Sequence, residues 1–217
     1  MQPYFQALSK HLLPEIESLA DKRANEEGLG NFSIPLAAIL FSMIDLLGYL
    51  IRKDTETDTP QNFRILLLND SYFPNSYRSE DVELVIKIYR HSITHTVFPR
   101  ATAEIGKYEK EPNLIIRDGN QLILNVHVLA KDFINAYAKI ILRIEQSDED
   151  LIKTISTRFK KMRDDDYKKY ADTIKYYEAC QLNRNMNKNP VKYRDRLELY
   201  KELDKSYSWN KNSMKWE

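Results

Sequence analysis

The 217-residue sequence predicts a mainly α-helical (all-α) protein with one inserted β-hairpin and a C-terminal helical extension. Apolar residues recur at a spacing of three to four over most of the first two thirds of the chain, which is the period of helices that bury one face. A single Asp118-Gly119 pair separates two short apolar runs, residues 114–116 and 122–124. This dipeptide favours a tight β-turn, so we expect a two-stranded hairpin at about residues 113–127.

The first two helices are predicted from their apolar residues and their end signals. Residues 4–24 place apolar side chains on one face, and Pro14 is expected to kink that helix. Ser33 is expected to be the N-cap of the second helix, with Pro35 in its first turn. The second helix should end near Arg52-Lys53.

Residues 34–51 of the second helix are apolar enough to raise the question of a membrane span. Asp45 lies in the middle of this stretch, and a carboxylate at the centre of a bilayer costs about 2.5 to 3.5 kcal/mol. We therefore expect a buried central helix and no membrane partner. Asp45 should be a hydrogen-bonded core carboxylate, or a supporting group if it pairs with Arg90 or a nearby histidine.

Three segments connect this helix to the next long one. We expect a polar loop over residues 54–61, a short helix over 63–68 and an irregular connection over 69–78. Ser79 is a plausible N-cap for the following helix, because acidic residues come directly after it. Pro99 should end that helix.

The helix that begins at Ser79 is predicted to have two apolar faces. One face should pack on the core and comprises Val82, Val85, Ile86, Tyr89 and Ile93. The second face, nearly opposite, comprises Leu84, Ile88, His91 and His95. Two faces imply two neighbours, so we expect a homodimer with this helix near the interface.

Tyr89-Arg90-His91-Ser92-Ile93-Thr94-His95 joins a permanent cation to a group that titrates near neutral pH. Arg90 and His95 are about 140° apart on an ideal helix. For both to reach one phosphate, either the helix is distorted near Thr94 or the site combines residues from two chains.

This segment resembles the signature of the HEPN superfamily (higher eukaryotes and prokaryotes nucleotide-binding), in which an arginine precedes a histidine by four to six residues and is usually followed by a polar residue. His91 occupies the polar position. The resemblance to bacterial proteins of this kind extends over roughly residues 1–145 and includes the Asn-Phe-Arg segment at residues 62–64. It implies a HEPN-like helical bundle, a dimer that joins two motifs in one cleft, and cleavage of RNA without a metal ion.

The resemblance implies a role for each residue of the motif. His95 would transfer protons and Arg90 would stabilise the charge that develops on phosphate oxygens, leaving a 2′,3′-cyclic phosphate and a 5′-hydroxyl. Tyr89, His91 and Thr94 would orient the pair or the substrate, and Arg100 would hold a flanking phosphate. The setting would be toxin-antitoxin or phage defence, with a cognate antitoxin or other protein as partner.

Other interpretations of the motif stay open. Arg90 alone is equally well explained as an exposed cation paired with Glu83 or Asp81, and His95 as a residue near a helix C-terminus. The same cleft in a non-catalytic HEPN-like module would bind RNA, a nucleotide or a protein. A helical protein that only packs against a partner is a third alternative.

The sequence gives little support to other chemistries. It has no phosphate-binding glycine loop, no cysteine cluster and no triad signature, so we expect no cofactor and no metal site. His91 and His95 do have the spacing of a helical metal pair, but no third ligand is evident beside them. A single cysteine, Cys180, and the lack of a signal-like N-terminus predict a cytoplasmic protein.

The composition changes after Glu145, which predicts domains at residues 1–146 and 147–217. The second has 17 Lys plus Arg against 13 Asp plus Glu, a net charge of +4, and tyrosines lie among these charges. We favour a solvated helical hairpin with a break at residues 183–190, and the alternative is an RNA-binding surface. His127, inside or just after the second strand of the hairpin, is expected to be a half-exposed strand residue.

Overall fold

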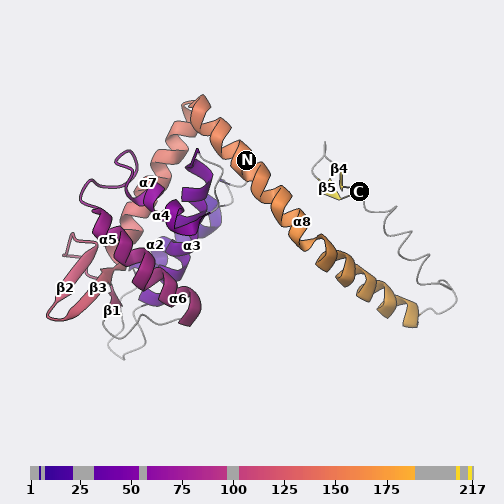
Figure 1. Cartoon of the computed structure of the whole chain (residues 1–217), viewed down its shortest axis with the longest axis horizontal. Helices are drawn as coiled ribbons and strands as arrows, with labels where there is room; N and C mark the ends of the chain where they lie inside the picture. The colour runs from indigo at the N-terminus through magenta and orange to yellow at the C-terminus, as the bar shows by residue number, and fades with distance from the viewer. Residues whose placement is uncertain are drawn as a thin grey trace. The chain divides into compact units, whose positions relative to one another are not determined.

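The computed structural model describes residues 5, 8–21, 32–53, 58–96, 103–188, 209–210 and 215–216, without the side chains of 94–96, 167, 172, 174, 182–188 and the last two pairs. The chain divides into two compact units, residues 1–160 and 161–217 (Figure 1). Helices dominate the described residues, which confirms the mainly α-helical prediction. The composition boundary at residue 146 falls in the turn between helices α7 (Val126–Glu145) and α8 (Glu149–Lys188).

The N-terminal helix consists of a π-helical turn, η1 (Leu8–Leu12), followed by α2 (Leu13–Asp21). The sequence predicts one helix with a kink at Pro14. The irregularity takes the form of a change of helix type just before Pro14. A proline has no N–H and crowds the carbonyl four residues earlier, which disfavours a regular α-turn at that point.

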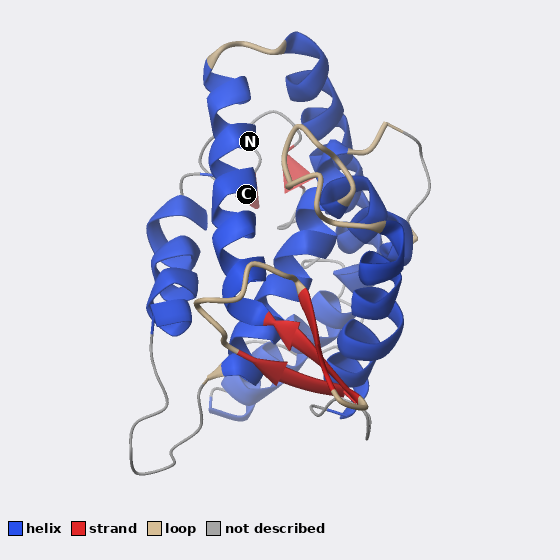
Figure 2. Ribbon diagram, turned by 90° about the vertical axis from the view of Figure 1, so that its left-hand side faces the viewer, coloured by secondary structure: helices blue, strands red, loops and turns tan. Residues whose placement is uncertain are grey.

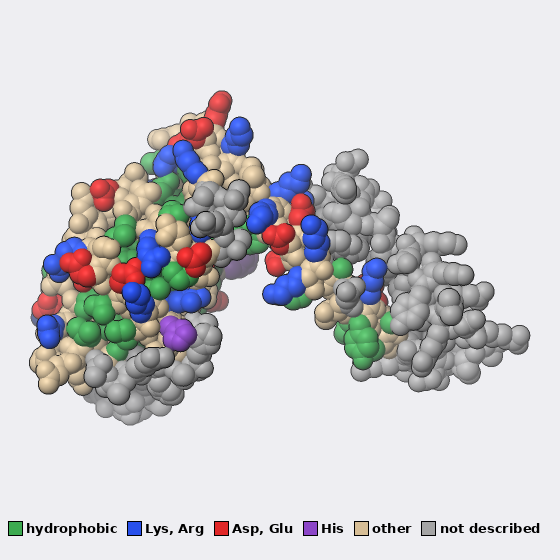
Figure 3. Space-filling view, viewed as in Figure 1, with side chains coloured by type: hydrophobic (Ala, Val, Ile, Leu, Met, Phe, Trp, Pro, Cys, Tyr) green, Lys and Arg blue, Asp and Glu red, His purple; other side chains and the backbone are tan. Residues whose placement is uncertain are grey.

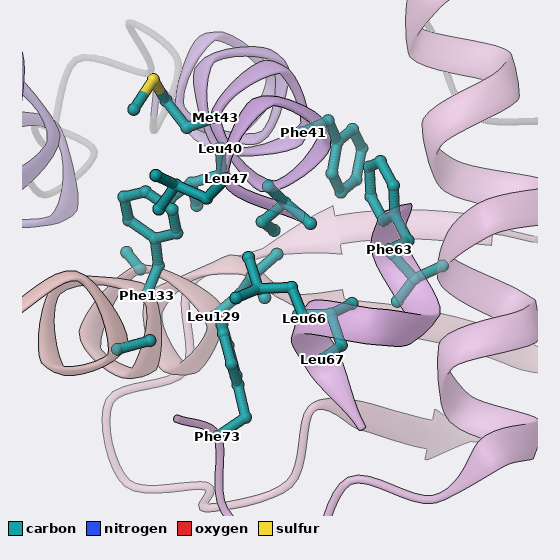
Figure 4. Close-up of a cluster of buried hydrophobic side chains, with 14 of the residues drawn as sticks. Leu40, Phe41, Met43, Leu47, Phe63, Leu66, Leu67, Phe73, Leu129 and Phe133 are labelled. Atoms are coloured by element: carbon teal, nitrogen blue, oxygen red, sulfur yellow. The ribbon is translucent and has the colours of Figure 1, made fainter. Parts of the chain in front are cut away.

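Helix α3 (Ser33–Ile51) is the buried centre of the first unit, as predicted. Figure 4 shows its apolar side chains facing those of α4 (Thr59–Leu67) and α7, and the rings of Phe41 and Phe63 have centroids 6.0 Å apart. The predicted N-cap is wrong by one residue: Phe32, with a φ of 55°, has that position, and Ser33 is buried in the first turn.

Among the described residues, α3 is the one helix long and apolar enough to cross a membrane by length and composition. Half of its apolar window is buried inside the protein. Because the core helix of a soluble protein has the same length and composition, this is weak evidence for a span.

Helix α4 (Thr59–Leu67) begins within the predicted polar loop, four residues before Phe63. Pro60 explains the earlier start, since proline suits the first turn of a helix. A Cβ on Gly48 would lie 2.1 Å from the carbonyl oxygen of Asn62, so glycine allows α3 and α4 to pack backbone against backbone.

The connection over residues 69–78 has no regular structure, as predicted, but polar bonds hold it against α7 (Val126–Glu145). The Tyr77 hydroxyl donates to Asp132 at 2.9 Å, and Lys139 donates to the carbonyl of Tyr72 at 3.0 Å. Arg143 also donates to the Tyr72 hydroxyl, at 2.5 Å.

The next helix, residues 79–96, is named the motif helix below and consists of three segments. They are α5 (Ser79–Leu84), the π-helical η2 (Val85–Arg90) and α6 (His91–Thr96). Ser79 is the first helical residue rather than the N-cap, a position that Arg78 occupies without a side-chain cap. Pro99, the expected stop signal, lies outside the described residues.

The predicted hairpin is present, with strands β2 (Ile115–Asp118) and β3 (Gln121–Asn125) joined through Gly119 at a φ of 55°. A third strand, β1 (Ala103–Gly106), pairs parallel with β3, which gives the order β1-β3-β2. The sequence does not predict β1, because four residues that include a glutamate and a glycine give no strand pattern. Figure 2 shows the three strands lying across the helices of the first unit.

Helix α7 follows β3 directly, and His127 is its second residue, half-buried. The expectation of a strand residue there is therefore wrong. Helix α8 (Glu149–Lys188) is continuous through the first part of the predicted break, and the second helix of the expected hairpin would lie in residues not described. Two further two-residue strands, β4 (Trp209–Asn210) and β5 (Lys215–Trp216), pair in the second unit.

Candidate functional site

The candidate site lies where the motif helix changes from π-helical to α-helical geometry. Segment η2 ends at Arg90, and the N–H of His91 donates to the carbonyl of Ile86, five residues back, as in a π-helix. The sequence predicts either a distortion near Thr94 or a site that combines residues from two chains. The distortion in the structure lies earlier, over Val85–Arg90, and the six residues that follow it are α-helical.

The core-facing side of the motif helix is the predicted one. All five residues of the predicted core stripe are buried: Val82, Val85, Ile86, Tyr89 and Ile93. Burial of this face fixes the rotation of the helix about its own axis, and with it the directions of the remaining side chains.

Tyr89 joins the motif helix to the sheet. Its ring is fully buried, and its hydroxyl donates a 2.6 Å hydrogen bond to the carbonyl oxygen of Leu122 in β3. Burial raises the pKa of Tyr89, and the nearby carboxylate of Glu104 raises it further. The hydroxyl therefore stays protonated near neutral pH and donates its proton to the backbone hydrogen bond with Leu122.

Arg90 and His91 are turned away from the core. Arg90 is half-buried and His91 is exposed, whereas Ser92 and Ile93 beside them are buried. Two adjacent polar residues of the motif thus have side chains partly accessible to a ligand.

The remaining predicted site residues are only partly described. Thr94 and His95 belong to α6, but the placement of their side chains lies outside the described part of the chain, as does all of Arg100. The backbone still constrains the pair, because five α-helical steps separate Arg90 from His95 by about 140°.

The two carboxylates considered as partners of Arg90, Glu83 and Asp81, each contact basic side chains. Glu83 accepts a 2.6 Å hydrogen bond from Arg64 and lies 3.0 Å from Lys87, and Asp81 lies 3.4 Å from Arg78. These bonds, chiefly that from Arg64, lower the pKa of Glu83 from 4.5 to about 2. Figure 3 shows basic and acidic side chains close together on this face of the first unit.

Asp45 is part of a polar cluster at the α3–α4 contact. Its carboxylate accepts a 2.7 Å hydrogen bond from Asn62, whose side-chain oxygen accepts one of 2.8 Å from Arg52. The Nε of Arg158 in α8 donates to the carbonyl of Arg52, and its guanidinium lies 4.8 Å from the Tyr49 ring centroid. Asp45 thus has a structural partner, as the sequence analysis expected.

The roles of Arg52 and Arg158, two arginines with exposed fractions of 1% and 4%, are not predicted from the sequence. The only available signal was the position of Arg52 at the end of a helix, where a cation is ordinarily solvated. Their burial depends on α8 returning to the end of α3, which no local pattern encodes.

Other kinds of site find little support in the described residues. They contain no group of three or more His, Cys, Asp and Glu side chains that could hold a metal ion. In the second unit, Tyr170, Tyr176 and Tyr177 are exposed along α8. Basic and acidic residues alternate around them, so this face has no strong excess of positive charge.

Comparisons with models of protein families, with curated proteins and with solved structures found no match.

Proposed function

We propose that the protein is a metal-independent endoribonuclease of the HEPN type, with Arg90 and His95 as its catalytic residues. The observation that carries the proposal is the accessibility pattern of the motif. Arg90, the last residue of the π-helical segment, is half-buried, and His91, which follows it, is exposed; both lie between buried neighbours. π-Helical turns within α-helices are frequent at functional sites because they redirect side chains.

The chemistry follows from the two groups. His95 would accept the proton of a ribose 2′-hydroxyl or return a proton to the leaving 5′-oxygen. Arg90 would stabilise the charge that develops on the phosphate oxygens, a role for which its fixed charge and planar donors are suited. The products would be a 2′,3′-cyclic phosphate and a 5′-hydroxyl end.

The proposal includes a homodimer. A regular α6 leaves Arg90 and His95 about 140° apart on one helix, and this favours a site completed by the second subunit. Light scattering should report a dimer at tens of micromolar, and a monomer at that concentration would remove the support for a composite site. A cytoplasmic setting in toxin-antitoxin or phage-defence systems, with a cognate antitoxin, belongs to the same proposal.

The test is cleavage of single-stranded RNA by the purified full chain in the presence of a chelator. His95→Ala should lower the rate by on the order of 10² to 10⁴, because it removes the proton-transfer group. Arg90→Ala should have a comparable effect through lost charge stabilisation. Matched controls are His11→Ala and Arg78→Ala, since both residues are exposed and lie outside the motif.

Three outcomes would contradict the proposal in different ways. Equal cleavage by wild type, His95→Ala and Arg90→Ala would point to another site or a contaminant. RNA binding without cleavage would favour the non-catalytic module. A requirement for added divalent metal would favour a metal pair formed by His91 and His95.

A further inference from the structure

The hydroxyl of Tyr89 is hydrogen-bonded to the central strand of the three-stranded sheet. Leu122, whose carbonyl accepts the Tyr89 hydrogen bond, belongs to β3, which pairs with β1 on one side and β2 on the other. A central strand paired on both edges moves less than an edge strand. The Tyr89 hydroxyl therefore connects the motif helix to a strand that is held on both sides.

Tyr89 also lies at the end of the π-helical segment. Segment η2 contains three buried residues, Val85, Ile86 and Tyr89, and Arg90 follows the last of them. A return to regular α-helical geometry would rotate the residues after η2, relative to those before it, by about one residue, or roughly 100°. The direction of Arg90 thus depends on what holds η2 in place.

We infer that Tyr89 is a positioning residue for Arg90: its hydrogen bond to Leu122 holds the end of η2 in π-helical geometry and so fixes the position of the half-buried Arg90 side chain. This inference rests on the proposed function. It assigns Tyr89 no contact with the substrate, because its ring is fully buried and its hydroxyl is bound to the backbone. It also gives the sheet a role in the site.

The variant that tests this role is Tyr89→Phe, which keeps the buried ring and removes only the hydroxyl. The matched control is Tyr137→Phe: Tyr137 is also buried, and its hydroxyl donates 2.8 Å to the carbonyl of Phe5, away from the motif. Both variants lose a bond to a backbone carbonyl, and Tyr137→Phe also loses the 3.0 Å hydrogen bond between the Tyr137 and Ser9 hydroxyls. The melting temperature should therefore fall in Tyr137→Phe by at least as much as in Tyr89→Phe.

Only Tyr89→Phe should impair cleavage. We expect kcat to fall by roughly 10-fold to 10²-fold with KM unchanged, because a displacement of about 1 Å at a catalytic group has effects of this size. The pH dependence assigned to His95 should stay unchanged. Tyr137→Phe should retain wild-type kcat, and an equal kcat in all three proteins would overturn the inference.

A second measurement does not depend on catalysis. Amide hydrogen exchange of residues 90–93 should be faster in Tyr89→Phe than in wild type and unchanged in Tyr137→Phe, because the hydrogen bond from His91 to Ile86 is released more often. Unchanged exchange in Tyr89→Phe would overturn the inference whatever the activity. If wild type cleaves no RNA but exchange is faster only in Tyr89→Phe, the proposed catalysis fails while Tyr89 keeps its positioning role.

Discussion

The α3–α4 pair and the motif helix both pack on the core, but the tightness of their packing differs. In the α3–α4 pair, Gly48 allows the two backbones to meet, and the polar groups at the contact, Asp45, Asn62 and Arg52, bind one another. The motif helix is divided into three short segments and leaves Arg90 partly accessible. Close backbone packing with internal polar partners favours stability, whereas an interrupted helix can present side chains to a ligand.

The largest effect on stability should come from filling the α3–α4 contact. In Gly48→Ala the new methyl would lie 2.1 Å from the Asn62 carbonyl oxygen and 2.6 Å from its carbon, so the helices must separate. We expect a loss of about 3 kcal/mol in the free energy of unfolding, measured by urea denaturation.

The control for this substitution is Gly119→Ala, where φ is +55° and nothing lies near the new methyl. The backbone strain of an alanine at positive φ should lower the free energy of unfolding by roughly 1 to 2 kcal/mol there. Equal losses of unfolding free energy in Gly48→Ala and Gly119→Ala would contradict a close backbone contact between α3 and α4.

A smaller effect should appear at the motif helix and depend on pH. The Glu83 pKa is lowered to about 2 by Arg64 and Lys87, so folding is stabilised above pH 4.5 and this stabilisation is lost as the pH falls towards 2. Because Arg64 and Glu83 are partly exposed, we expect at most about 1 kcal/mol. Unfolding of Glu83→Gln followed between pH 2 and pH 6 should show a weaker acid dependence than wild type.

The pKa of Asp132 is shifted in the opposite direction to that of Glu83. Burial raises its pKa despite the hydrogen bond from Tyr77, so the unfavourable burial of its charge grows as the pH rises through the raised pKa. The free energy of unfolding of Asp132→Asn, relative to that of wild type, should therefore be higher at pH 6 than at pH 3. A pH dependence of Glu83→Gln with the same sign as that of Asp132→Asn would contradict this account.

The smallest effect is expected outside the first unit. Tyr176 on α8 is 72% exposed, so Tyr176→Ala should change the free energy of unfolding by less than about 0.5 kcal/mol. With acidic residues among the basic ones on this helix, we also expect unchanged affinity for single-stranded RNA in a mobility-shift assay. A clear loss of affinity would favour the RNA-binding alternative for this segment.

The sequence by itself determined the features that arise from neighbouring residues. Asp118-Gly119 specified a hairpin because glycine readily adopts the positive φ that the turn requires. The spacing of Val82, Val85, Tyr89 and Ile93 specified the buried side of the motif helix. It therefore indicated that Arg90 lies off the buried stripe, and Arg90 is half-buried in the structure.

Only the tertiary structure decided the features that join distant segments. Strand β1 forms because β3 offers it a parallel partner, not because of its own four residues. The π-helical geometry of η2 is accompanied by burial of Tyr89 and its bond to Leu122, 33 residues away. Arg52 and Arg158, 106 residues apart, are buried together because α8 packs against the end of α3. Periodicity records which face of a helix is apolar, but it carries no information about which distant backbone group that face will meet.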